Sequence, residues 1–116
     1  MRTEFVTPDH QDFLNTLGVE AEITGDTQRT LKFAEVTGED LTFSYDATGQ
    51  SVRVAWRNAS GKNLVTIFRE GATLLRITEE GGVTQLLTEF RTRDTAGQLV
   101  VQVFPDVQVE EKSLLS

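Results

Sequence analysis

The chain has 116 residues, of which 38% are hydrophobic and 25% charged, a composition typical of a folded globular protein. We expect one domain spanning residues 1–116, with a net charge of −7 at pH 7. The sequence has no cysteine and one histidine, which excludes a disulfide framework, thiolate metal sites and a cysteine nucleophile. No apolar run approaches 18 residues and no signal region opens the chain, so we expect a cytoplasmic protein without a membrane span.

The negative charge is concentrated in the first half of the chain. Residues 1–50 contain ten acidic and three basic side chains, whereas residues 51–100 contain five acidic and seven basic ones. An acidic surface repels phosphate, which argues against nucleic-acid binding, and it permits a basic protein partner near the N-terminal half. The alternative is that the charge serves solubility alone. The acidic residues assigned to the partner surface are Glu20, Glu22, Asp26, Glu35, Glu39 and Asp40.

Residues 7–17 are predicted to form one short helix. Thr7 can cap its first turn, Pro8 suits that turn, and Gly18 can end the helix in a left-handed conformation. A helix this short needs a surface to pack on. Its predicted apolar face consists of Phe13, Leu14 and Leu17. We therefore expect the helix to cover part of a sheet.

Residues 19–104 follow a period of two, interrupted by turn signals every 10–12 residues, which is typical of antiparallel β-structure. The turn signals are Gly25-Asp26, Thr37-Gly38-Glu39-Asp40, Ala47-Thr48-Gly49, Asn58-Ala59-Ser60-Gly61, Glu70-Gly71, Glu79-Glu80-Gly81-Gly82 and Asp94-Thr95-Ala96-Gly97. The early strands have one apolar face, formed by Val19, Ala21, Ile23, Leu31, Phe33, Leu41, Phe43, Tyr45, Val52, Val54 and Trp56. Short connections predict that consecutive strands pair as neighbours.

Two later strands, 64–68 and 99–104, are apolar on both faces and therefore predict cover on both sides. Residues 105–116 are assigned to a C-terminal tail, in which 107–109 could form a short edge strand. The fold class is mainly β: an antiparallel meander of about eight strands, closed as a barrel or folded as a sandwich, with one short N-terminal helix.

The sequence offers no constellation for catalysis, metal binding or a cofactor. His10 has no evident partner residue, and the glycine-containing turns do not match a phosphate-binding loop. Glu20 and Glu22 share one face of a predicted strand, but they lack the spacing of a calcium loop. An enzyme is therefore the least supported class, and no catalytic, cofactor-binding or metal-binding residue is assigned.

The second half of the chain places arginines at strand positions, where some must share a sheet face. These are Arg53, Arg57, Arg69, Arg76 and Arg91. Such a stripe could bind carboxylates of a partner, because guanidinium groups match carboxylate geometry. Cross-strand pairing with Asp46, Glu70 and Glu89 is the structural alternative. The predicted partner-binding set is therefore these five arginines together with Glu20 and Glu22.

The leading hypothesis is a small non-enzymatic interaction protein, an inhibitor, immunity-type protein or adaptor, that binds a protein partner through charged sheet faces. One alternative is a small-molecule carrier with an apolar pocket inside a curved sheet. The residues expected to line that pocket are Phe33, Phe43, Tyr45, Trp56 and Phe68. The other alternative is a self-assembling structural subunit, in which a second copy covers the two-sided strands.

Overall fold

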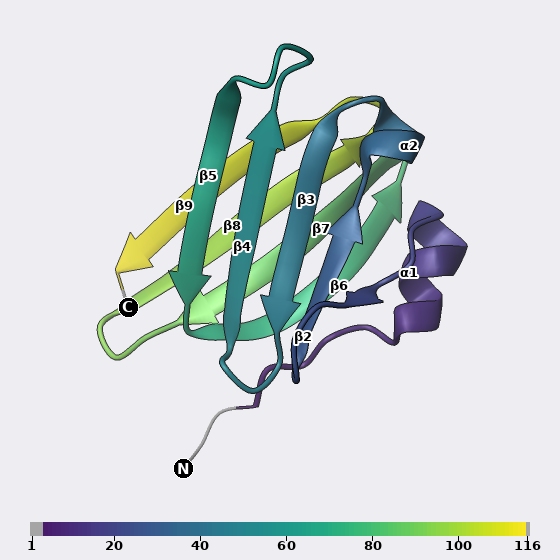
Figure 1. Cartoon of the computed structure of the whole chain (residues 1–116). Helices are drawn as coiled ribbons and strands as arrows, with labels where there is room; N and C mark the ends of the chain where they lie inside the picture. Colours follow the sequence, from purple (N-terminus) through teal and green to yellow (C-terminus); the bar gives the residue numbers. More distant parts are fainter. Residues whose placement is uncertain (1–3, 116) are drawn as a thin grey trace.

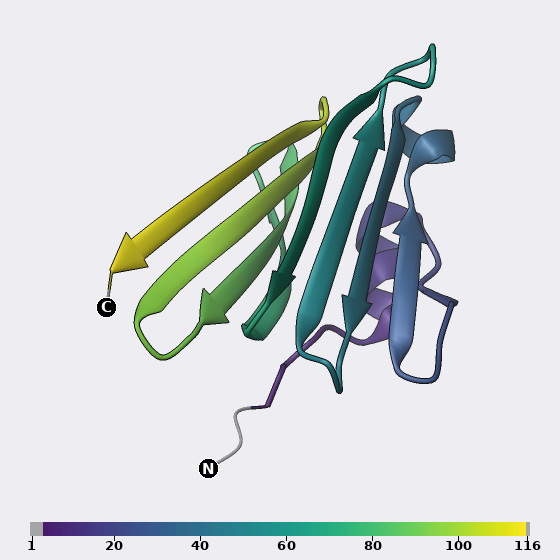
Figure 2. The same ribbon diagram turned by 60° about the vertical axis from the view of Figure 1, so that its left-hand side comes forward.

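The computed structural model describes residues 4–115 and shows two antiparallel sheets packed face to face (Figures 1 and 2). The first sheet contains β1 (Glu22–Ile23), β2 (Gln28–Lys32), β3 (Asp40–Asp46), β4 (Ser51–Arg57) and β5 (Asn63–Glu70). The second contains β6 (Ala72–Glu80), β7 (Val83–Arg91), β8 (Thr95–Phe104) and β9 (Gln108–Leu115). Within each sheet, strands that are consecutive in the sequence pair with one another, which confirms the meander, and only β5 and β6 lie in different sheets.

The prediction of a mainly β fold with a short N-terminal helix is confirmed. Residues 4–115 form nine strands instead of about eight, and the two sheets are not closed, so the barrel alternative is wrong. The chain passes from the first sheet to the second at Gly71, between β5 and β6. This residue has a φ of +86°, and an added Cβ would lie 3.2 Å from the Arg91 carbonyl oxygen, so glycine suits the tight crossing.

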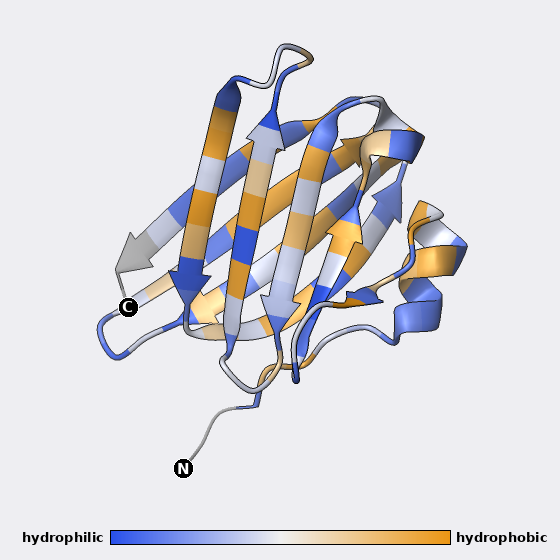
Figure 3. Cartoon of the chain, in the orientation of Figure 1, coloured by the Kyte–Doolittle hydropathy of each residue, from blue (hydrophilic) through white to orange (hydrophobic). Residues whose placement is uncertain are grey.

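The core lies between the sheets and follows the predicted alternation. Along β3, Leu41, Phe43 and Tyr45 are buried and the residues between them are partly exposed. They pair with the inward residues of β4, since Phe43 lies opposite Val54 and Tyr45 opposite Val52. Figure 3 shows the resulting alternation of apolar and polar residues along the strands. The second sheet contributes Ala72, Leu75, Leu86, Phe90, Leu99, Val101 and Val103.

Helix α1 (His10–Leu17) begins three residues later than predicted. Asp9 is its N-cap, and the Asp9 carboxylate accepts a hydrogen bond from the Gln11 backbone N–H at 3.1 Å. Thr7 is not the cap, because the chain before the helix pairs with β6, where Val6 forms a parallel bridge with Leu74, and the helix begins only at His10. Gly18 ends the helix with a φ of +71°, as predicted.

One element was not expected from the sequence, and another is longer than expected. Residues Ala34–Thr37 form a single helical turn, α2, that ends at Gly38 with a φ of +75°. The short edge strand considered for 107–109 is longer: β9 extends over most of the residues assigned to a tail and pairs with β8 from Gln102 opposite Gln108 to Thr95 opposite Leu115. The open edge of β8 supplies this partner, and the charged residues of β9 suit an edge strand.

Candidate protein-binding surfaces

The five predicted arginines do not form one stripe. Arg53 and Arg57 share the outer face of β4. Arg76 and Arg91 are exposed on the second sheet, in alternation with its buried inner residues. Arg69 points the other way, into the space between the sheets. The meander distributes these positions over three surfaces, so the sequence pattern predicted their strand locations and not a common site.

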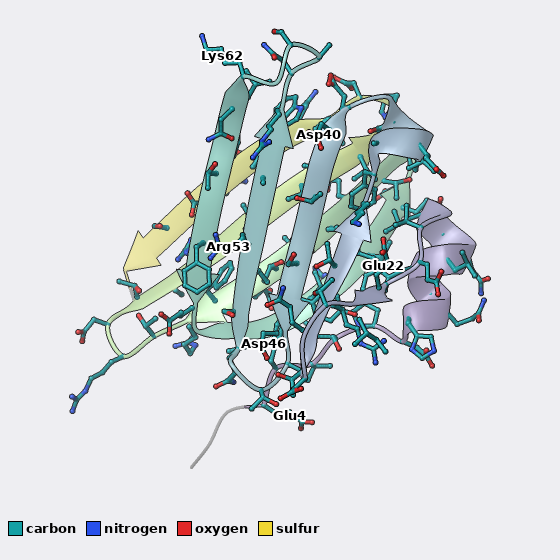
Figure 4. The ribbon with its side chains drawn as sticks, in the orientation of Figure 1. Glu4, Glu22, Asp40, Asp46, Arg53 and Lys62 are labelled. Carbon is teal, nitrogen blue, oxygen red and sulfur yellow. The ribbon has the colours of Figure 1, made fainter. Side chains whose placement is uncertain are left out.

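Arg53 lies against an exposed aromatic ring on the neighbouring strand. Its guanidinium carbon is 5.1 Å from the ring centroid of Phe68, its cross-strand neighbour (Figure 4). Phe68 is 52% exposed and Leu64 47% exposed on the same outer face of β5. The prediction that this strand is covered on both sides is therefore not met by residues 4–115. Arginine beside an exposed aromatic side chain is a combination common at protein interfaces.

Arg69 joins the free edges of the two sheets. Its guanidinium is 3.3 Å from the Glu111 carboxylate on β9, and its Cζ is 4.3 Å from the Phe90 ring centroid. Gly97 lies directly beneath it, since a Cβ there would approach the Arg69 Nη2 to 2.9 Å. The side chain is 20% exposed. Arg69 therefore links β5 to β9, and its acidic partner is not one of the three that the sequence suggested.

Glu20 and Glu22 lie at the opposite side of the molecule, where α1 and α2 flank an open groove. This acidic groove has a volume of about 1060 Å³ and is lined by the segment 18–23, parts of α1 and β2, and the start of α2. Figure 4 places Glu22 on the side of the first sheet that faces α1. Both predicted glutamates are exposed there, together with Glu35 from α2. The fold thus brings three carboxylates from separate elements to one concave surface.

The charges of the acidic groove are only partly neutralised. Lys32 lies 3.6 Å from Glu22. Among the residues that the structure describes, Glu20 and Glu35 have no ion-pair partner. Arg29 also lines the groove and lies close enough to Tyr45 to affect its phenol. Burial raises the pKa of Tyr45, and the Arg29 charge opposes that shift. The groove lining therefore carries three carboxylates and two basic side chains, a small excess of negative charge, and Glu20 and Glu35 are the carboxylates left unpaired.

Two large apolar side chains are exposed within this groove. Ile23 is 71% exposed and Leu14 46% exposed, and both belong to patterns that predicted burial. Ile23 continues the alternation of Val19 and Ala21, which are buried, but β1 is only two residues long and Ile23 lies beyond the covered part of the sheet. Exposed apolar residues surrounded by charged ones are typical of binding surfaces.

The aromatic residues proposed to line a carrier pocket do not surround one space. Phe33, Phe43 and Tyr45 are packed within the hydrophobic core. Phe68 lies on the outer face of the first sheet, opposite to them. The prediction of a pocket lined by these residues was therefore wrong, because alternation along β5 turns Ile67 inward and Phe68 outward.

His10 is exposed at the start of α1, with its Nδ1 3.6 Å from the Asp9 carboxylate. Within residues 4–115, no group of three histidine, aspartate or glutamate side chains could hold a metal ion. No helix of this part of the chain is long and apolar enough to cross a membrane.

Comparison with known proteins identifies the fold. No protein-family model matches the chain, and no curated protein is similar to it in sequence. A solved structure is similar: a chain of the "contact-dependent growth inhibition toxin - immunity protein complex" from Klebsiella pneumoniae 342, with a TM-score of 0.83. The match covers 97% of this chain and 100% of that one at 12% sequence identity, so it shows a shared fold. The fold is thus one that occurs in a complex between two proteins.

Proposed function

We propose that this chain is an immunity-type protein that binds a protein toxin through the acidic groove and thereby blocks it. The observation that carries the proposal is the groove itself, where exposed Ile23 and Leu14 lie among Glu20, Glu22 and Glu35. An apolar centre within a charged rim provides both desolvation energy and electrostatic selection of a partner. The similarity to a chain of a toxin–immunity complex supports this class of function.

The chemistry of the groove defines the partner. Unpaired carboxylates at Glu20 and Glu35 favour a basic surface, and the exposed Ile23 side chain favours an apolar pocket within it. Oppositely charged surfaces accelerate association, and burial of the apolar centre slows dissociation. We therefore expect the partner to carry lysine or arginine around an apolar depression.

The test is co-expression with the protein encoded beside this chain in its genome. The chain should restore growth of cells that produce that protein, whereas expression of the chain alone should leave growth unchanged. Growth arrest by the chain alone would indicate that it is the toxin of such a pair. Failure to restore growth, together with no binding in calorimetry, would overturn the proposal.

Two variants test the groove, each with a matched control elsewhere. Ile23→Asp should weaken binding by a factor of about 30 or more, while Leu64→Asp, which changes an exposed apolar residue on β5, should not. The double reversal Glu20→Lys and Glu35→Lys should slow association and reduce its salt dependence. The same reversal at exposed Glu80 and Asp94 should have little effect.

A second candidate is self-association through the outer face of β5. Leu64 and Phe68 are exposed there, and β5 is an edge strand of its sheet. A second copy would cover both the apolar side chains and the open edge. Sedimentation should then show a dimer that Phe68→Asp dissociates, and a strict monomer at high concentration would exclude it.

A further inference from the structure

The edge of β6 is only partly covered by the chain. Near its start, the Val6 N–H donates to the Thr73 carbonyl at 3.0 Å and the Leu75 N–H donates to the Val6 carbonyl at 2.8 Å. This is a parallel pairing, and it shows that the edge accepts an extended segment that runs in the direction of β6.

The pairing stops at Val6 because of the next residues. Pro8 has no backbone N–H and cannot continue the pairing, and Asp9 then begins the cap of α1. The chain therefore leaves the edge, and no other segment within residues 4–115 pairs with β6 on this side. The edge beyond Leu75 is left without a neighbouring strand.

The register defines which backbone groups remain open. The Leu75 N–H points away from β7, and backbone groups alternate along a strand, so Ile77 and Glu79 also direct their N–H and C=O to the open edge. The β6–β7 hairpin agrees with this assignment. Glu80 pairs with Val83 across the two-residue turn Gly81–Gly82, so Thr78 and Glu80 bond to β7 while Ile77 and Glu79 do not.

A groove of about 460 Å³ lies along this open edge, between β6 and α1. Its lining includes Val6, Asp12, Thr16, Arg76, Ile77 and Glu79. Ile77 is half-buried and offers an apolar contact, whereas Asp12 and Glu79 are exposed carboxylates. The volume lies within the range of sites that hold a small ligand or a few residues of a peptide.

We propose that this groove binds an extended segment of a partner protein, which pairs in parallel with β6 and continues the pairing that Val6 begins. The segment places an apolar side chain beside Ile77 and, two residues later, a basic side chain near Glu79 and Asp12. Main-chain hydrogen bonds to Ile77 and Glu79 supply affinity, and the two side-chain contacts supply selectivity. This site is separate from the acidic groove and goes beyond the function proposed for it.

The test uses the full chain and the peptide acetyl-TVTKT-amide, followed by amide hydrogen exchange in NMR spectra. In the free protein, the Ile77 and Glu79 amides should exchange about tenfold or more faster than those of Arg76 and Thr78, which bond to β7. Saturating peptide should slow Ile77 and Glu79 selectively. The same peptide N-methylated at its three threonines should have no effect. In this register their N–H groups face β6, and methylation prevents them from donating to the Leu75, Ile77 and Glu79 carbonyls.

A pair of variants at Glu79 separates backbone pairing from charge. Glu79→Pro removes the edge N–H without removing a bond to β7, and it should abolish the peptide effect while the protein stays folded. Glu79→Gln keeps the N–H and should weaken binding by about fivefold or less.

Three results would overturn the proposal. One is slow exchange at Ile77 and Glu79 in the free protein, and another is an equal response to the N-methylated peptide. The third is protection that rises with protein concentration alone, which would identify a second copy as the occupant. Each of these results leaves the acidic-groove test unaffected, since that test depends on Ile23, Glu20 and Glu35.

Discussion

On one side of the sandwich, α1 covers the gap between the sheets with apolar side chains, whereas on the other side β5 and β9 are joined by a charged pair. Phe13 and Leu17 of α1 are fully buried, and the Phe13 ring centroid lies 5.7 Å from that of Tyr45. The opposite side has the Arg69–Glu111 pair, with a 20% exposed guanidinium. Apolar burial contributes far more free energy than an ion pair near solvent, so we expect the two sides to differ in stability.

Both proposed binding sites lie on the side of the sandwich that α1 covers. The acidic groove and the β6 groove are each formed partly by α1, at residues that lie around its buried face. Helix α1 therefore shapes both grooves, and its buried residues Phe13 and Leu17 belong to the hydrophobic core. Loss of its packing should affect binding as well as folding.

The largest expected effect is that of Phe13→Ala. Removal of this fully buried ring should lower the free energy of unfolding by about 3–5 kcal/mol, because it leaves a cavity under α1. Leu14→Ala, one residue along the helix and largely exposed, is the control and should cost less than about 1 kcal/mol. Urea unfolding measures both. Equal losses in the free energy of unfolding for the two variants would mean that the buried face of α1 is not what stabilises this side of the sandwich.

A smaller effect is expected from Gly97→Ala on the charged side. The new Cβ would lie 2.9 Å from both Arg69 Nη2 and the Lys112 carbonyl oxygen, and relief of these contacts should cost about 1–3 kcal/mol. In an Arg69→Ala background the cost should fall without disappearing, because the Lys112 carbonyl remains. Thermal unfolding of the wild type, the two single variants and the double variant checks this. A Gly97→Ala protein as stable as the wild type would show that the strands separate easily here.

The Arg69–Glu111 interaction should be weaker still. A double-mutant cycle with Arg69→Met and Glu111→Gln should give a coupling of about 1 kcal/mol or less, because both groups retain contact with solvent. The coupling should decrease in high salt, whereas the loss caused by Phe13→Ala should not. A coupling as large as the Phe13 effect would contradict the distinction between the two sides.

The smallest effect should come from a turn that belongs to neither side. Hydrogen bonds from the Gly49 N–H and then from Thr27 lower the pKa of Asp46, which stabilises the folded state above the ordinary aspartate pKa. This stabilisation should disappear as the pH falls through the lowered value. The stability difference between wild type and Asp46→Asn should therefore shrink below about pH 4. A stability difference between the wild type and Asp46→Asn that stays constant down to pH 2 would contradict this role of the Asp46 carboxylate.

The sequence predicted most of the fold because local signals and tertiary packing agree over the meander. The alternation of Leu41, Phe43 and Tyr45 requires one buried face, and the spacing of turns allows only neighbouring strands to pair. The predicted start of α1 was less accurate. Thr7 and Pro8 satisfy helix-capping rules, but the Val6–Leu74 bridge holds the chain before them against β6, and the helix begins at His10. Strand β9 was anticipated only as a possible short strand at 107–109, since its later residues are mostly charged or polar and pair because β8 offers an edge.

The candidate sites were predictable only in part. Glu20 and Glu22 were predicted to bind a partner, and the structure shows that both are exposed in the acidic groove. The exposure of Ile23 contradicts its own alternation pattern. No local signal distinguishes Arg69, which lies between the sheets, from Arg53, which lies outside. The different orientations of these two arginines on neighbouring strands can be assigned only when the strand register is known.

By itself, the sequence determined the class of fold, the order of the strands and the acidic character of the first half of the chain. These follow from hydrophobic period, turn chemistry and charge, which act over a few residues. The tertiary structure decided that the meander folds into two open sheets, that Arg69 joins their edges, and that Glu20, Glu22 and Glu35 meet at one groove. Such arrangements depend on contacts between residues far apart in the chain, whose geometry is defined only when both sheets pack on a common core.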